Sequence, residues 1–173
     1  AVLHVPGYAC PVDLTARPSL RHALVPLDGT SDSAVLLRSV AALSKLAAGR
    51  QTLLRVLRWD GLFMRGDAGG RENARDLTDR SVAYLDEMAN TWRHELSRVR
   101  SSVLWSDASA AYAIFAEAQE QDVDFIAMTM RPRGRLKRLL RPRVFDRLIP
   151  RARTPILVVK QHGEDTGAPS LSA

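Results

Sequence analysis

The order of apolar segments along the chain constrains its fold more than any other feature. Five short, nearly continuous apolar segments alternate with stretches in which apolar residues recur at helical spacing. Short apolar runs bounded by turn residues are typical of strands buried on both faces, and the helical stretches between them are typical of helices that cover those faces. The expected strands are residues 22–28, 51–57, 98–105, 123–130 and 154–160. The alternation therefore predicts an α/β domain, a three-layer α/β/α sandwich around a five-stranded parallel sheet.

Four helices are expected between these strands, within residues 31–49, 72–96, 106–118 and 142–152. Ser31 or Asp32 is the expected N-cap of the first helix, and Gly49 is its expected terminator. Ser106 or Asp107 is the expected N-cap of the third helix. Because ligands of such sheets bind beyond the carboxyl ends of the strands, the segments that follow each strand are the first place to look for a site.

The chain divides into three parts. Residues 1–21 are expected to form an arm or linker, residues 22–160 the folded domain, and residues 161–173 a disordered tail. The chain does not begin with Met, which is compatible with a fragment of a longer protein. No apolar run approaches the roughly 20 residues of a membrane-spanning helix. Cys10 is the sole cysteine, so no intramolecular disulfide forms, and we expect a cytoplasmic location.

Positive charge is concentrated in residues 131–153. This segment holds ten Arg or Lys residues and one acid, Asp146, a local charge of +9 in a chain whose net charge is +6. Its candidate partners are an acidic protein, nucleic acid through phosphate contacts, or an anionic membrane surface. No aromatic residues that would stack on bases are interleaved with these charges. The plainer interpretation, which we prefer, is a solvated face whose leucines dock on the sheet.

Four segments together resemble the universal stress protein (UspA-like) family over residues 22–160. They are ALVPLDGTSDS at 23–33, QTLLRVL at 51–57, VDFIAMT at 123–129 and RARTPILVVK at 151–160. The resemblance implies an adenine nucleotide alpha hydrolase-like fold with strand order 3-2-1-4-5. It also implies a homodimer formed through the last strand, Pro155 to Lys160, and a regulatory or stress-protective role rather than an enzymatic one. No catalytic residues and no metal site are expected.

Many members of this family bind ATP with a glycine loop that follows the fourth strand. The three glycines of that loop fall on Thr129, Pro132 and Pro142, and its final Ser or Thr falls on Arg143, so none of the four positions keeps its residue. Other nucleotide contacts of the family have better counterparts here. They are Asp28 for the carboxylate after the first strand, Val56 for the backbone contact to adenine, and Met128 and Val144 for the apolar residues that flank the loop.

The replaced loop changes the ligand that we expect. A glycine loop binds phosphates through backbone N–H groups that approach closely, and proline has no N–H. The ordinary triphosphate cradle should therefore be absent, and no cofactor is expected. The alternative is an ATP-binding switch or weak ATPase in which Arg133 and Arg143 hold the phosphates by their side chains.

Each of these residues also has a simpler interpretation. Asp28 precedes a glycine and can cap its own turn, and Val56, Met128 and Val144 can be core residues. The segment from Asp28 to Leu37 partly resembles the phosphate loop of ATP pyrophosphatases, but Asp28 and Thr30 stand where that loop has Ser and Gly. Asp32 and Ser33 are more simply explained as helix-capping residues.

Overall fold

A computed structural model of the chain describes residues 2–4, 20–30, 33–59, 68–96, 98–130 and 154–160. Nine elements lie within these ranges. The strands are β1 (Val2–His4), β2 (His22–Pro26), β3 (Arg50–Arg58), β4 (Arg98–Ser106), β5 (Phe125–Met130) and β6 (Ile156–Lys160). The helices are α1 (Ser33–Ala47), α2 (Ala68–Thr91) and α3 (Ala110–Glu120).

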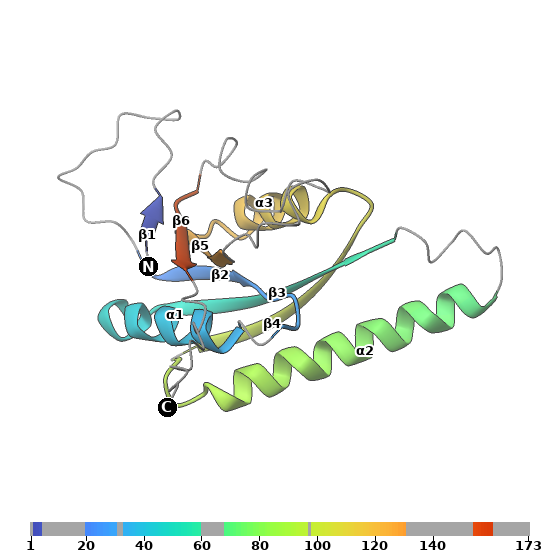
Figure 1. Ribbon diagram of the computed structural model, residues 1–173, viewed down its shortest axis with the longest axis horizontal. Coiled ribbons are helices and arrows are strands. Elements are labelled where there is room, and N and C mark those ends of the chain that lie inside the picture. Colours follow the sequence, from blue (N-terminus) through green and yellow to red (C-terminus); the bar gives the residue numbers. More distant parts are fainter. Residues whose placement is uncertain are drawn as a thin grey trace, which may run out of the picture.

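One sheet contains all six strands, in the order β1-β6-β5-β2-β3-β4 (Figure 1). The five strands from β2 to β6 are parallel, and counted among themselves they have the order 3-2-1-4-5. The predicted parallel sheet and its strand order are therefore confirmed. The chain reverses direction across the sheet at β2, because β3 and β4 lie on one side of it and β5 and β6 on the other.

Strand β1 adds a sixth, antiparallel member to this sheet. Its three residues pair with β6, so that Leu3 lies opposite Leu157. The sequence analysis placed this segment in an arm or linker and expected a homodimer through Pro155 to Lys160, whereas in the structure this edge of β6 pairs with β1 of the same chain. Three residues are too few to show a period in the sequence, so β1 had no signal of its own.

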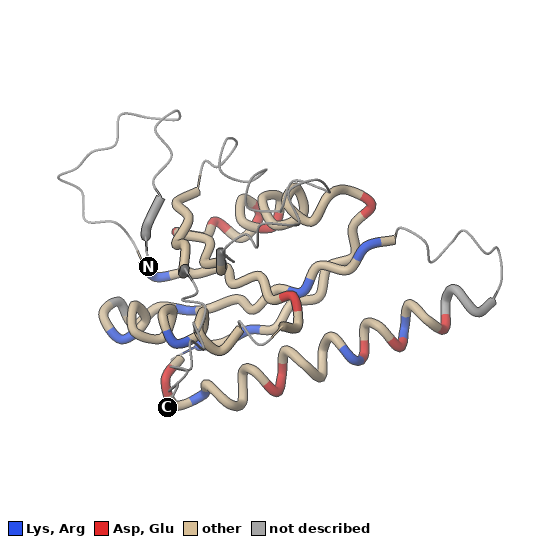
Figure 2. The backbone as a smooth tube through the Cα atoms, in the orientation of Figure 1, with Lys and Arg blue, Asp and Glu red and all other residues tan. Residues whose placement is uncertain are grey.

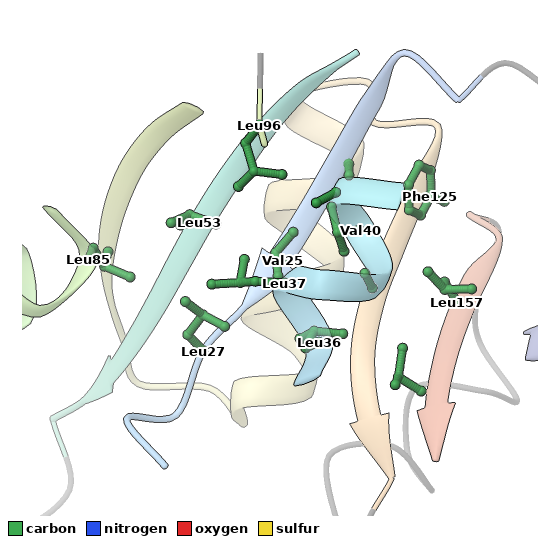
Figure 3. Packing of buried hydrophobic residues seen from close by; sticks show 14 residues of the cluster. Val25, Leu27, Leu36, Leu37, Val40, Leu53, Leu85, Leu96, Phe125 and Leu157 are labelled. Carbon is green, nitrogen blue, oxygen red and sulfur yellow. The ribbon is translucent and has the colours of Figure 1, made fainter. Parts of the chain in front are cut away.

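Helices cover both faces of the sheet, as predicted. Helices α1 and α2 lie on one face and α3 lies on the other (Figure 1). The two faces have separate hydrophobic cores, because neighbouring residues of a strand point to opposite sides. Val25 and Leu53 pack beneath α1 and α2, as Figure 3 shows, whereas Leu24 and Leu54 pack against α3. The expected helix 142–152 lies outside the described residues.

The ends of the helices differ from the sequence expectation. The residue with positive φ after α1 is Ala48 (φ 47°), and Gly49 is required for another reason. A Cβ on Gly49 would lie 2.8 Å from the backbone oxygens of Leu20 and Arg21. The N-cap of α3 is Ser109 and not Ser106 or Asp107; the Ser109 hydroxyl accepts a hydrogen bond from the backbone N–H of Tyr112.

Helix α2 is long but strongly charged. Acidic and basic residues alternate along it (Figure 2), and Arg80 forms an ion pair with Asp76 one turn away, at 2.7 Å. Within the described part of the chain, no helix is both long and apolar enough to cross a membrane. α2 begins at Ala68, four residues before the expected start, and ends at Thr91, before the expected end at Leu96.

Candidate functional site

A pocket of about 280 Å³ opens at the carboxyl ends of β2, β3 and β5. It lies at the point where the chain reverses direction across the sheet, which is where open α/β sheets bind their ligands. The N-terminal ends of α1 and α3 contribute Ser33 and Ala110 to its walls. The volume is near the lower end of the range of small-molecule sites, so the described part of the pocket suits a ligand of about the size of a nucleoside.

Four of the seven residues predicted from the sequence meet in this pocket. Asp28, Val56, Met128 and Thr129 all line it. The remaining three, Arg133, Arg143 and Val144, lie outside the described residues. The structure thus brings together residues that are up to 101 positions apart in the sequence, because parallel strands end at the same edge of the sheet.

Val56 and Met128, the two apolar residues of these four, belong both to the hydrophobic core and to the pocket wall. Met128 is buried in the same core cluster as Ile114 of α3, and Val56 is half-buried and packs against that cluster. Their side chains, together with that of Ile114, give the pocket an apolar wall. Such a wall suits the flat, weakly polar face of a base or a similar ring.

Asp28 closes the turn that follows β2. Its Oδ1 atom accepts hydrogen bonds from the backbone N–H of Thr30, at 3.0 Å, and from the Thr30 hydroxyl, at 2.6 Å. Gly29 between them has a φ of 81°, which glycine adopts without strain. The turn-capping interpretation of Asp28 therefore agrees with the geometry. The side chain is exposed at the pocket, and Oδ2 makes no hydrogen bond to the described residues, so this oxygen can still accept one from a ligand.

The sequence analysis did not predict Arg55 as a pocket residue. Its Nη1 donates to the backbone oxygen of Leu27 at 3.3 Å, and its guanidinium carbon lies 5.9 Å from the centre of the Tyr84 ring. Its Nε is buried without a hydrogen-bond partner among the described residues. Arginine is rarely buried unless it is paired, so a charged residue within the otherwise apolar run of β3 was the signal that could have indicated this position.

Arg55 also fixes the shape of the turn above it. A Cβ on Gly29 would lie 2.9 Å from Nη1 of Arg55, so the guanidinium and the turn are in close contact. The hydroxyl of Tyr84 is hydrogen-bonded to that of Ser33 at 2.6 Å, and Ser33 in turn donates to the backbone oxygen of Thr30. The pocket thus presents one carboxylate and one guanidinium in an otherwise largely apolar wall.

Thr129 does not begin a loop. It lies inside β5 and is aligned with Val159 of β6 in the parallel ladder, which continues to Met130. A β-branched side chain favours this extended conformation. At the position of the first loop glycine, the chain therefore carries a side chain and is paired as a strand. The apolar wall and Asp28 fit the nucleoside part of a nucleotide, whereas Thr129 does not provide the bare backbone of a glycine loop.

Metal binding finds no support in the described part of the chain. No group of three or more His, Cys, Asp or Glu side chains is arranged there to hold an ion.

Comparison with known proteins gives a consistent result. The model of the Universal stress protein family matches residues 19–160. No curated protein is significantly similar in sequence. Among solved structures, hypothetical protein MJ0577 has a TM-score of 0.70 and 22% identity, with 83% of this chain and 98% of that chain covered.

Two further similar structures contain nucleotides. The universal stress protein from Archaeoglobus fulgidus in complex with dAMP has a TM-score of 0.56 and 19% identity, and the match covers 80% of this chain and 96% of that one. A universal stress protein in complex with cAMP has a TM-score of 0.59 and 15% identity, with 81% and 96% covered. At these identities the structural likeness shows the fold alone.

Proposed function

The chain belongs to the universal stress protein family, and from that premise we propose that it is a regulatory domain of the stress response without the ordinary triphosphate cradle. Its pocket takes a nucleoside-sized ligand at the carboxyl ends of β2, β3 and β5. The domain acts through binding rather than catalysis.

The single observation that carries this proposal is the conformation of Thr129. It is a paired strand residue at the position where the family has the first glycine of its phosphate loop. The prolines at positions 132 and 142 support the same conclusion from the sequence, because neither can donate a backbone hydrogen bond. Without those donors, the phosphates of ATP gain little from binding here.

The part of the pocket that is retained supports binding of the nucleoside. Val56, Met128 and Ile114 offer an apolar wall, and Asp28 offers a carboxylate oxygen to a hydroxyl donor such as a sugar. Two structural relatives were solved with dAMP and cAMP, which carry one phosphate each. We therefore expect adenosine, AMP and ATP to bind with similar, weak affinities.

Titration calorimetry with adenosine, AMP and magnesium-ATP tests the proposal. Saturable binding of ATP in the low micromolar range, much tighter than that of AMP, would reject it. Replacing Ala110 by Phe fills the described pocket and should abolish binding of all three ligands. Tyr112→Ala is the matched control, because Tyr112 lies on the same helix with its side chain 64% exposed.

A second candidate is an ATP-binding switch or weak ATPase that holds phosphates with arginine side chains. The nucleotide complexes of the structural relatives favour it, as do the many guanidinium groups that follow β5 in the sequence. In that case ATP binds more tightly than adenosine, and Arg133→Ala and Arg143→Ala each remove the difference while leaving adenosine binding unchanged.

The basic segment 131–153 gives a third candidate, binding of nucleic acid, an anionic membrane surface or an acidic protein. Its local charge of +9 favours this function. Affinity that falls steeply with salt concentration is the expected signature. If neither DNA nor acidic vesicles retain the protein at low salt, nucleic acid and an anionic membrane are excluded as partners. An acidic protein is then the remaining candidate.

A further inference from the structure

The outer side of β4 is open. In the order of the sheet β4 is the last strand, and it pairs with β3 along its whole length, from Arg98 opposite Arg50 to Ser106 opposite Arg58 (Figure 1). No strand in the described part of the chain pairs with its other side. β4 has nine residues, which span about 30 Å. A strand edge of this length presents a long row of N–H and C=O groups to an added strand.

The side of this edge that faces α3 is basic. Arg98 and Arg100 are exposed and lie two positions apart, so they point to the same face of the sheet. Leu104 shares that face and packs against the core cluster beneath α3. Arg50 of β3, also exposed, lies directly opposite Arg98, and like charges in such a position repel. No ion pair joins these three arginines to an acid among the described residues, so this face attracts acidic groups.

The side of the edge that faces α2 is largely apolar. Val99 and Val103 are half-buried and pack against the core cluster beneath α1 and α2. Trp105 is half-buried on the same face, and its Nε1–H donates to the hydroxyl of Thr78 of α2 at 2.9 Å. Because these side chains belong to the core and still reach solvent at the edge, apolar residues of an added strand would extend the core there.

One acid lies on this apolar side. Asp86 of α2 accepts a hydrogen bond from the hydroxyl of Ser101 at 3.0 Å. Val82 lies between Asp86 and Thr78 on the same face of the helix, one turn from each, and it is 39% exposed. An acidic side chain that pointed toward α2 would be repelled by the carboxylate of Asp86, whereas an apolar one would pack against Val82. The two sides of the edge therefore favour different kinds of side chain.

We propose that β4 docks an extended segment of another protein in which acidic residues alternate with apolar ones. Successive side chains of a strand point to opposite faces, so such a segment places its acids beside the arginines and its apolar residues beside the valines and Trp105. Backbone hydrogen bonds to the open edge provide affinity, and the two rows of side chains provide specificity. No residue of β4 lines the pocket, so this binding surface is separate from the candidate site.

The composition of β4 determines which occupant fits. Its sequence, RVRSSVLWS, contains two arginines and no acid, so a second copy of β4 would bring further positive charge to the edge. Charged edge residues of this kind hinder pairing between sheets of the same protein. A nucleic acid would neutralise the arginines, but it has no peptide groups to pair with the open edge and no row of apolar side chains. An acidic, extended protein segment matches the backbone, the charge and the apolar side together.

A short peptide of alternating glutamate and valine, blocked at both ends, tests the proposal. It should bind at low salt in titration calorimetry, and amides of β4 that point away from β3 should exchange hydrogen more slowly in its presence. Two control peptides separate strand pairing from charge. One has the same residues with all glutamates at one end, and the other keeps the order but carries N-methyl groups in place of its backbone donors. Both should bind at least about tenfold more weakly.

Charge reversal tests the arginines. Arg98→Glu and Arg100→Glu should each weaken binding of the alternating peptide by about fivefold or more. Both positions are exposed, and equal urea unfolding midpoints for variants and wild type show that the fold is retained. Arg38→Glu is the matched control, because Arg38 is exposed on α1, which contacts β5 and β6 in the other half of the sheet. This control should bind the peptide as the wild type does.

Three results would overturn the proposal. One is the absence of binding of the alternating peptide at low salt. Another is equal binding of the alternating peptide and either control peptide, which would show attraction by charge without strand pairing. The third is binding that persists unchanged in Arg98→Glu and Arg100→Glu without protection of β4. That result would place the acidic ligand on another surface, such as the basic segment 131–153, so the two surfaces are distinguished.

Discussion

His22 is a buried histidine at the start of β2, at the end of the sheet opposite to the pocket. Its Nε2 lies 3.0 Å from the hydroxyl of Thr52, which donates to Gln121, so the histidine is the donor to that hydroxyl. Its backbone N–H donates to Asp124 at 2.7 Å. Burial, and then the positive charge of Arg50, lower the pKa of His22 below its usual 6.5.

This lowered pKa predicts a loss of stability in acid. Below about pH 6.5 the unfolded chain binds a proton that the folded His22 does not, so the free energy of unfolding decreases as the pH falls toward the folded pKa. Urea unfolding should show a lower midpoint at pH 5.5 than at pH 7.5. His22→Gln should reduce this dependence and cost about 1 kcal/mol at neutral pH.

His94 provides the control for this prediction. Its side chain is exposed in the turn after α2, so His94→Gln is the same substitution at a surface position and should change the free energy of unfolding at neutral pH by less than about 0.5 kcal/mol. Equal pH profiles for the wild type and for His22→Gln would show that the buried histidine does not contribute to the acid sensitivity.

At the level of elements, the end of α1 depends on two neighbouring residues with opposite requirements. Ala48 has a positive φ of 47°, so Ala48→Gly should relieve strain and stabilise the fold by about 0.5–1 kcal/mol. Gly49→Ala places a Cβ 2.8 Å from two backbone oxygens, which should destabilise it by about 1–3 kcal/mol. Urea unfolding of each variant measures the change in its free energy of unfolding. Destabilisation by both substitutions would contradict this account of the turn.

Helix α1 contributes to stability through one face. Leu37 is 0% exposed and points into the core between helix and sheet (Figure 3), whereas Leu46 on the same helix is 81% exposed. Leu37→Ala should reduce the free energy of unfolding by about 2–5 kcal/mol, and Leu46→Ala should change it by less than about 0.5 kcal/mol. Thermal or urea unfolding gives both values, and equal losses would mean that α1 is not docked as described.

The elements that the sequence predicted well are those with a continuous signal. The apolar runs that contain β2, β3 and β5 were predicted within two residues at each end, because burial on both faces selects apolar residues throughout. β1 was missed because its stability comes from β6, which lies more than 150 positions away in the sequence. The N-cap at Ser109 was missed because Ser106 and Asp107 offer the same chemistry two or three residues earlier.

The candidate site was predictable to a lesser extent, for a related reason. Asp28, Val56 and Met128 were identified because the resemblance to the family marks them. The environment of Arg55 depends on Tyr84 and on the backbone of Leu27, and contacts between separate elements are not visible in a one-dimensional pattern. A cation inside an apolar strand indicates that a partner exists, but only the packing of the helix against the sheet shows which one.

For the whole molecule, the fold of the family is retained, while the sequence departs from the family's glycine-loop pattern at the four positions named above. The sheet and both helical layers are in place, and the pocket lies at the reversal point of the strand order. If the proposed function is correct, tight binding of phosphates should be restorable, because a pocket that takes the nucleoside needs only donors for the phosphates.

Rebuilding the loop tests this view directly. Thr129→Gly, Pro132→Gly, Pro142→Gly and Arg143→Ser together restore the backbone donors and the hydroxyl that the family pattern has at these positions. Affinity for magnesium-ATP should rise at least about tenfold, equivalent to roughly 1.4 kcal/mol, while affinity for adenosine stays the same, as measured by calorimetry. Thr129→Val is the matched control and should not raise ATP affinity, because it keeps a β-branched strand residue. If the rebuilt loop leaves ATP no tighter than adenosine, the replaced residues are not what limits phosphate binding, and the reason must lie in the rest of the pocket.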